Sequence, residues 1–237
     1  MRVSKRSNNP TLIPQMKTSS LSGDTSQGIS SDVFEEFQFW KATEKDVSEI
    51  KSFLCQDFIF NEPLNQALKS TPDELMPLLT FLVESSVKDA FSILVKHKGT
   101  LVACVLNSLH TLSTNLGKIP AETFPEKATI IGNFINKMEE NSLQRILNND
   151  KQLNCSSTKY LIVEVISVSS SIANQRNCQE TNERYRRNGK TASAFLLLFE
   201  KIGYSTIYAL QHKDYVTEDG RQIFHCPDNA TTWPKEC

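Results

Sequence analysis

One stretch of this 237-residue chain has an order of residues that suits a site where a cofactor meets strand backbone. An apolar strand is predicted at 159–168 (KYLIVEVISV), and a polar segment with several arginines follows it. A short predicted helix then ends at Gly203 in the run 199–204 (FEKIGY), before a second β-rich run at 205–210. Loops held by a rigid scaffold often carry function, so this region is the first candidate for a site.

The cysteine and histidine residues show no spacing typical of a nucleophilic or metal site. The six cysteines are scattered without a CxxC pair, and the one His–Cys neighbour pair is His225-Cys226. We expect mostly reduced, structural thiols, with a disulfide or a zinc site as the alternatives, because free cysteine usually behaves as a small buried hydrophobe. We interpret His97, His110 and His212, which occur singly in or near predicted strands, as structural. No metal site is predicted.

The charge balance and hydropathy limit the partners. Twenty-six Lys and Arg residues against 27 Asp and Glu give a net charge of −1, so the chain has no global basic field for nucleic acid. The cluster Arg184–Arg187 is interpreted as a solvated helix face that ends at Asn188-Gly189. The apolar runs are far shorter than the ~20 residues of a membrane span, and the N-terminus lacks an apolar signal core. We expect a soluble, cytoplasmic protein that contacts neither nucleic acid nor membrane.

The chain divides into a tail and one domain. Residues 1–33 are rich in Ser, Thr, Asn and Gln and cannot bury enough surface to offset chain entropy, which predicts a disordered tail. A single domain is predicted at 34–237. It begins with an edge strand at 37–40, and residues 43–46 (TEKD) then cap a helix that carries Val47, Ile50, Phe53 and Leu54 on one face.

Further patterns alternate between helix and strand. The capping box at 71–74 (TPDE) opens a helix with leucines and Val83 at helical spacing. Residues 91–95 and 101–106 form a predicted hairpin around Lys98-Gly99. A helix is predicted at 122–150, broken near Asn141-Ser142 by two poor helix formers, and strands are predicted at 160–168 and 190–195. Helices interleaved with a sheet indicate the α+β class.

Four segments carry a resemblance to a known family: 42–46 (ATEKD), 61–65 (NEPLN), 163–168 (VEVISV) and 199–204 (FEKIGY). Their order resembles the GNAT superfamily of acetyl-CoA-dependent N-acetyltransferases, and particularly its arylalkylamine N-acetyltransferase-like branch. With 214–215, 219–220 and 223–224 they span roughly residues 37–228. The resemblance implies a GNAT-like mixed, mostly antiparallel sheet flanked by helices, with acetyl-CoA as cosubstrate and a small primary amine as acceptor.

Glu62 is the general base that the resemblance implies. An amine is cationic at pH 7 and must lose a proton before it can attack a thioester, and a carboxylate takes a proton more readily in apolar surroundings that raise its pKa. Phe58, Ile59, Phe60 and Leu64 are expected to supply such surroundings. The alternative is a solvent-facing Glu that precedes a helix begun by proline and is stabilised by the helix dipole.

The resemblance also implies a cofactor site. The backbone of Ile166, Ser167 and Val168 would face the pantetheine arm of acetyl-CoA. The loop 169–178 would wrap the pyrophosphate through its last four residues, Gln175, Arg176, Asn177 and Cys178. Small residues are expected there, so that backbone can approach phosphate.

This loop departs from the family pattern. The three motif positions fall on Ala173, Arg176 and Cys178, none of which is the expected residue, although the Arg176 charge could pair with a phosphate. A rival register at 186–191 (RRNGKT) keeps Arg and Gly, but it leaves 175–185 as an insertion and too few residues for the elements that follow.

The general acid is expected among Ser193, Tyr204 and Tyr208. Two functions therefore stay open. The first is acetyl transfer to an arylalkylamine-like amine by direct attack. The second is an acetyltransferase-like protein with weak or no CoA binding that acts as a binding or interaction protein.

Overall fold

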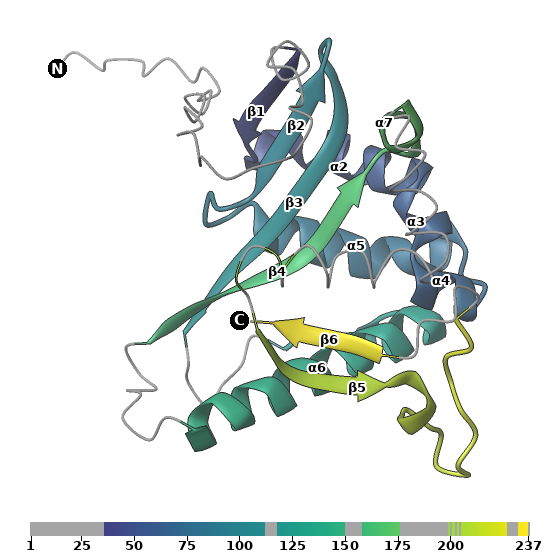
Figure 1. Ribbon diagram of the computed structural model, residues 1–237. Helices are drawn as coiled ribbons and strands as arrows, with labels where there is room; N and C mark the ends of the chain where they lie inside the picture. Colours follow the sequence, from purple (N-terminus) through teal and green to yellow (C-terminus); the bar gives the residue numbers. More distant parts are fainter. Residues whose placement is uncertain are drawn as a thin grey trace, which may run out of the picture.

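The computed structural model describes residues 36–111, 118–149, 158–175, 205–226 and 232–236, together with Phe199, Lys201 and Gly203 (Figure 1). The N-terminal part contains β1 (Phe37–Lys41), the 3-10 turn η1 (Glu44–Asp46), α2 (Val47–Gln56), α3 (Phe58–Asn61), α4 (Pro63–Ala67) and α5 (Pro72–Ser86). Then follow β2 (Ile93–His97), β3 (Thr100–Thr111), η2 (Ala121–Thr123), α6 (Glu126–Asn149) and β4 (Lys159–Val168). The last elements are α7 (Ser170–Gln175), β5 (Thr206–Gln211), η3 (His212–Asp214) and β6 (Thr232–Glu236).

The described strands form two antiparallel sheets. Four of them lie in the order β1-β2-β3-β4, while β5 pairs with β6 in a separate hairpin. Helices α2 and α5 pack on one face of the larger sheet, and the hairpin lies against α6 (Figure 1). The predicted α+β class, with a mostly antiparallel sheet flanked by helices, is confirmed. None of the helices in the described ranges is long and apolar enough to cross a membrane.

Local signals in the sequence predict the first half of the fold correctly. The Thr43 N–H donates to Asp46 Oδ2 at 2.8 Å, and the Thr71 N–H donates to Glu74 Oε2 at 2.8 Å, so both capping boxes form. Lys98 and Gly99 have φ values of +51° and +79°, which a two-residue turn of type I′ requires. The edge strand, the two helix faces and the hairpin are confirmed.

The predicted break in the long helix is wrong, because α6 runs without interruption over 24 residues. Ser142 is buried and its hydroxyl donates to the Met138 carbonyl at 2.7 Å. The Asn141 Nδ2 donates to the Tyr208 hydroxyl at 3.0 Å. Because both side chains find partners, packing against the β5–β6 hairpin outweighs their low helix propensity, a cost of well under ~1 kcal/mol each.

Strand β4 has the predicted bounds but is not buried throughout. Leu161, Val163 and Val168 remain 40–48% exposed, whereas Ile162, Val165 and Ser167 face the core. The pairing with β3 shifts between Leu106 and Asn107, so Glu164 has no cross-strand partner and forms a β-bulge. Bulges bend a strand and redirect a side chain.

The C-terminal part agrees with the prediction in its first strand. The predicted run at 205–210 is β5, and Gly203, at φ +101°, follows the helical residues Phe199 and Lys201. The partner strand β6 lies at 232–236, beyond a turn closed by an isolated bridge between Val216 and Gln222. The expectations for 1–33, 176–178 and 190–195 lie outside the described residues.

Candidate functional site

A cavity of about 60 Å³ lies beneath β4, between α5, α6 and the corner where α3 meets α4. Leucines of α5, from Leu75 to Leu82, form one wall, and Ile131 and Ile135 of α6 form another. Within the described structure, the ionisable groups that line it are Glu62 and Glu164. Two carboxylates among aliphatic side chains suit a cationic or proton-donating ligand, because a low-polarity wall strengthens the interaction between opposite charges.

Glu62 sits at the α3–α4 corner, where the residue before a proline is disfavoured in helical conformation. Its φ and ψ of −73° and 126° end α3, and Pro63 then begins α4. Glu62 Oε2 accepts a hydrogen bond from the Asn65 N–H at 2.7 Å. Glu62 therefore caps α4, as the alternative interpretation supposed, but it is half-buried and lines the cavity rather than facing solvent.

The apolar surroundings of Glu62 differ in part from the expectation. Phe58 and Leu64 line the cavity with it, and Ile59 is buried in the core. The prediction is wrong for Phe60, whose side chain is 54% exposed. Most of the apolar wall comes instead from α5 and α6, because the chain brings those helices under β4.

Glu164 enters the same cavity from the β4 bulge and is held from β3. The Ser108 hydroxyl donates to Glu164 Oε1 and lies 2.7 Å from His110 Nε2. Glu164 and His110 have side chains that are 11% and 18% exposed, and their nearest N and O atoms are 3.8 Å apart. Ser108 is buried. These three side chains form a hydrogen-bonded chain from the cavity wall toward the surface.

Tyr160 and Glu139 extend this network. The His110 and Tyr160 rings stack, with centroids 5.5 Å apart, and the Tyr160 hydroxyl donates to Glu139 Oε1 at 3.0 Å. Burial, and then the neighbouring Glu139 carboxylate, raise the pKa of Tyr160 well above its ordinary value. Tyr160 thus stays neutral and keeps donating to Glu139 across the physiological pH range.

Sequence reasoning missed this group. The sequence shows no partner for His110 at nucleophilic or metal spacing, but its Nε2 lies 2.7 Å from the hydroxyl of Ser108, two residues before it on the same strand face. The Ser-x-His spacing was the available signal. The carboxylate that completes the chain, Glu164, lies 56 residues away from Ser108, and no local pattern predicts that contact.

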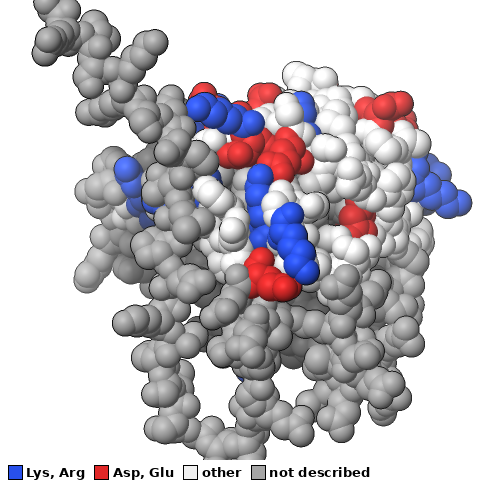
Figure 2. Space-filling view, turned by 90° about the horizontal axis from the view of Figure 1, so that it is seen from above, with Lys and Arg blue, Asp and Glu red and all other residues white. Residues whose placement is uncertain are grey.

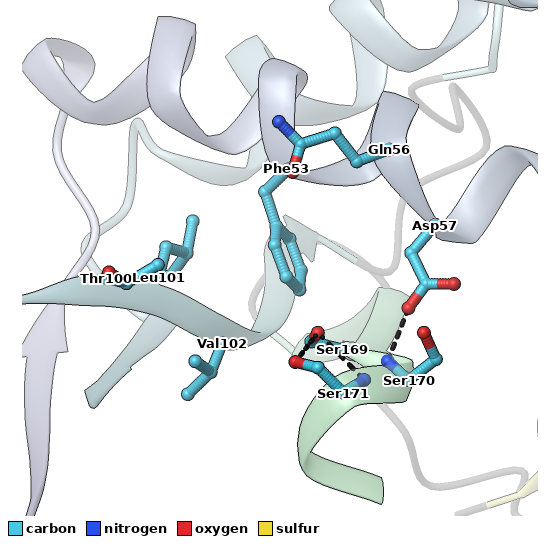
Figure 3. Close-up of a pocket in the computed structure, with 9 residues that line it drawn as sticks. All are labelled: Phe53, Gln56, Asp57, Thr100, Leu101, Val102, Ser169, Ser170 and Ser171. Carbon is cyan, nitrogen blue, oxygen red and sulfur yellow. Dashed lines mark hydrogen bonds between the residues drawn. The ribbon is translucent and has the colours of Figure 1, made fainter. Parts of the chain in front are cut away.

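A second hollow, of about 320 Å³, lies where β4 meets α7 (Figure 3). Phe53, Gln56 and Asp57 line it from the end of α2, residues 100–102 from β3, and the three serines 169–171 from the start of α7. Figure 3 shows the Asp57 side chain directed at Ser170, and Asp57 Oδ2 accepts a hydrogen bond from the Ser170 N–H.

The predicted phosphate loop is therefore partly a helix. Ser169 turns the chain directly after β4, since its N–H donates to the Val102 carbonyl at 2.8 Å. Residues 170–175 then form α7. The Ser170 N–H at the start of this helix donates to the Asp57 carboxylate. Arg176, Asn177 and Cys178 lie outside the described residues.

The remaining predicted site residues separate into three groups. Ile166, Ser167 and Val168 pair with β3 through Val105, Cys104 and Ala103, and in the described structure no strand pairs with the other edge of β4. Tyr208 packs against α6, with Arg145 5.0 Å above its ring, and does not line the cavity. Ser193 and Tyr204 lie outside the described ranges.

The described thiols do not add a nucleophile to either hollow. Cys55, Cys104 and Cys226 are free cysteines, and none of them lines the cavity under β4. Burial raises the pKa of Cys104 to about 12, so its thiol is protonated and unreactive at neutral pH.

The described residues on the face drawn in Figure 2 show no dominant charge. On the face in Figure 2, Lys and Arg side chains of the described part lie among Asp and Glu side chains. Among the described residues, some charged side chains form pairs, such as Lys96 with Glu49 at 2.7 Å and Lys127 with Glu74 at 3.1 Å.

No family model matches the sequence, and no curated protein matches it. Solved structures do. Arylalkylamine N-acetyltransferase 2 from Aedes aegypti aligns with a TM-score of 0.66 at 20% identity, over 85% of this chain and 97% of its own. A polyamine N-acetyltransferase from Drosophila melanogaster that forms N-acetylagmatine aligns with a TM-score of 0.62 at 18% identity, over 83% and 96%. The C-terminal condensation domain of Ebony, in complex with β-alanyl-dopamine, aligns with a TM-score of 0.60 at 16% identity, over 85% and 99%.

These likenesses establish the fold. The chain has the fold of arylalkylamine and polyamine N-acetyltransferases, which is the fold that the resemblance of its four sequence segments implied.

Proposed function

We propose that this protein is an acetyl-CoA-dependent N-acetyltransferase that acetylates a small primary amine of the arylalkylamine type. One observation carries the proposal: a half-buried carboxylate, Glu62, is fixed at the rim of an aliphatic cavity beneath β4. The fold shared with known amine acetyltransferases supports it.

Glu62 accepts a proton from the bound ammonium in the proposed reaction. The freed lone pair attacks the thioester carbonyl, a C–N bond forms, the C–S bond breaks, and the CoA thiolate leaves. The hydrogen bond from the Asn65 N–H holds Glu62 in one orientation, so no reorganisation is needed when the proton arrives. No covalent enzyme intermediate is required.

The size of the cavity sets how an amine lies in it. A cavity of about 150 Å³ holds benzene, whereas this one measures about 60 Å³. The amino group and its first carbons fit there, and a ring attached to them lies outside the described cavity.

Two regions bear on the binding of acetyl-CoA. The outer edge of β4 at Ile166–Val168 is available for hydrogen bonds with the pantetheine amides, since those residues pair only with β3 in the described structure. The start of α7 fits less well. The Ser170 N–H at this point already donates to the Asp57 carboxylate. A pyrophosphate bound there would lie next to that carboxylate, and the two negative charges would repel each other.

That contact favours a second candidate function, a non-catalytic protein that keeps the fold for binding or interaction. Ala173, Arg176 and Cys178 at the three motif positions point the same way. The two functions differ in whether the native protein binds acetyl-CoA.

Two measurements on the purified full chain separate them. Thermal unfolding with increasing acetyl-CoA is expected to show a midpoint that rises with concentration, because a ligand specific for the native state stabilises it by mass action. Release of free CoA thiol is then followed with phenethylamine, tryptamine and a short alkylamine. A constant midpoint up to millimolar acetyl-CoA, with no thiol release, would refute the enzyme and leave the binding protein.

A further inference from the structure

We infer that Glu164, Ser108 and His110 form the path by which the ammonium proton leaves the cavity. The inference rests on the proposed function, and it concerns residues to which the resemblance gave no role. The two carboxylates of the cavity have different hydrogen-bond partners. Glu62 accepts from the Asn65 N–H of α4, whereas Glu164 accepts from Ser108, which also contacts His110 nearer the surface.

The β4 bulge lets Glu164 and its neighbour Val165 face the cavity together. In a regular strand, residues 162 and 164 would face one side and residue 165 the other. Here Ile162 and Val165 are both buried on the core side, and Glu164 between them lines the cavity together with Val165. Bulges next to active sites redirect side chains in this way.

The Ser108 hydroxyl can donate its hydrogen bond either to Glu164 or to His110, and these two arrangements correspond to the states before and during proton transfer. Ser108 Oγ contacts both Glu164 Oε1 and His110 Nε2, so a single hydroxyl joins an acid to an imidazole. With the serine hydroxyl donating to Glu164, the carboxylate is held as an anion. With the hydroxyl turned to His110 Nε2, Glu164 can carry a proton and donate it to Ser108.

The step balances as a relay of one proton. Glu62 has taken the proton from the ammonium, and the relay begins as its new O–H bond breaks and an O–H bond forms on Glu164, across the cavity that both carboxylates line. Glu164 passes a proton to Ser108 Oγ as Ser108 passes its own to His110 Nε2, which restores both the carboxylate and the hydroxyl. His110 releases the proton to water at its exposed edge, where its side chain is 18% exposed. The amine keeps the electron pair that attacks the thioester.

Other ionisable groups face this path. Tyr160 on β4 stacks on His110, Glu139 on α6 accepts from Tyr160, and Glu62 shares the cavity with Glu164.

The test removes the middle of the path. Ser108→Ala is expected to lower kcat about tenfold at pH 7 with little change in KM, and the loss should shrink toward pH 10, where free amine is plentiful. His110→Gln keeps a hydrogen-bonding group beside Ser108 but cannot carry a proton, so it should lose kcat to the same extent. Ser108→Thr, which keeps the hydroxyl, should restore the rate.

A matched control is Ser142→Ala, which removes a buried hydroxyl of α6 remote from Ser108 in the sequence and should leave kcat unchanged. Thermal unfolding of each variant checks the fold, and if Ser108→Ala does not fold, His110→Gln decides. A wild-type rate and pH profile in His110→Gln would overturn the relay while the acetyltransferase stands. Absence of acetyl transfer in the wild-type protein would overturn both.

Discussion

Replacing Glu62 separates its two roles, as a proton acceptor and as the cap of α4. Glu62→Gln keeps an oxygen that can accept from the Asn65 N–H but cannot take a proton, whereas Glu62→Ala removes both functions. Loss of a general base lowers turnover by about 10²–10⁴-fold, so both variants should show this loss at pH 7. Both should recover at high pH, where the amine is already neutral.

The effects on stability should differ between the two variants. Loss of a cap costs about 1 kcal/mol, which lowers Tm by about 2–4 °C in a domain of this size. Glu62→Ala should show that shift, and Glu62→Gln a smaller one, since only its interaction with the helix dipole is lost.

Thr71→Ala serves as the control, because it removes the cap of α5 without touching a carboxylate of the cavity. It should lower Tm to a similar extent as Glu62→Ala and leave kcat intact. The assay is CoA thiol release from pH 6 to 10, together with thermal unfolding. A neutral-pH rate in Glu62→Gln equal to that of the wild type would remove Glu62 from the mechanism, and an unchanged Tm in Glu62→Ala would show that the cap contributes nothing.

Three further variants test other contacts. Asp57→Asn removes a negative charge beside the Ser170 amide and should tighten acetyl-CoA binding about tenfold in calorimetry. The control Asp73→Asn, at an exposed site on α5, should leave the affinity unchanged. Equal affinities of Asp57→Asn and the wild type would show that no phosphate lies near Asp57. In the wild type the buried Asn107 N–H donates to the Ser92 hydroxyl at 2.8 Å, so Ser92→Ala leaves that N–H without a partner and should lower the free energy of unfolding by about 1–3 kcal/mol. Ser85→Ala, which removes a hydroxyl that donates to a helix carbonyl, should lower it far less. Hydrogen bonds from Thr71 and the Lys127 ammonium lower the pKa of Glu74 below 4.5, so its carboxylate stabilises the fold above that pH and the contribution is lost as the pH falls through the lowered value. Glu74→Gln should therefore unfold more readily than the wild type at pH 7, and the difference in Tm should shrink as the pH falls below 4.5. A difference in Tm that stays constant with pH would contradict this.

The parts of the fold that the sequence predicts are those whose determinants lie within a few residues. The boxes at Thr43 and Thr71 and the turn at Lys98-Gly99 each depend on contacts across three or four positions, so their residue types are sufficient. The helix break near Asn141 was predicted wrongly for the opposite reason. Its outcome depends on Tyr208, 67 residues away.

The candidate site follows the same division. Glu62 could be identified because its motif and its cap are local, and even its apolar neighbours Phe58 and Leu64 lie within four residues. Glu164 was part of a quoted motif but received no role, because its function depends on a bulge and on Ser108 of another strand. A bulge has no signature in a single sequence, since it arises from how two strands pair.

Because Glu164 is the extra residue of the β4 bulge, the pairing of β3 with β4 does not depend on it. Without residue 164, Ile162, Val165 and Ser167 would still alternate toward the core, and Val163 and Ile166 would still alternate away from it. A chain shorter by this one residue would therefore keep every strand pair and lose only a carboxylate. Strand length at this point, rather than residue identity alone, is then the feature to compare between this protein and others of its fold, since a single inserted residue is enough to add an acid to the cavity.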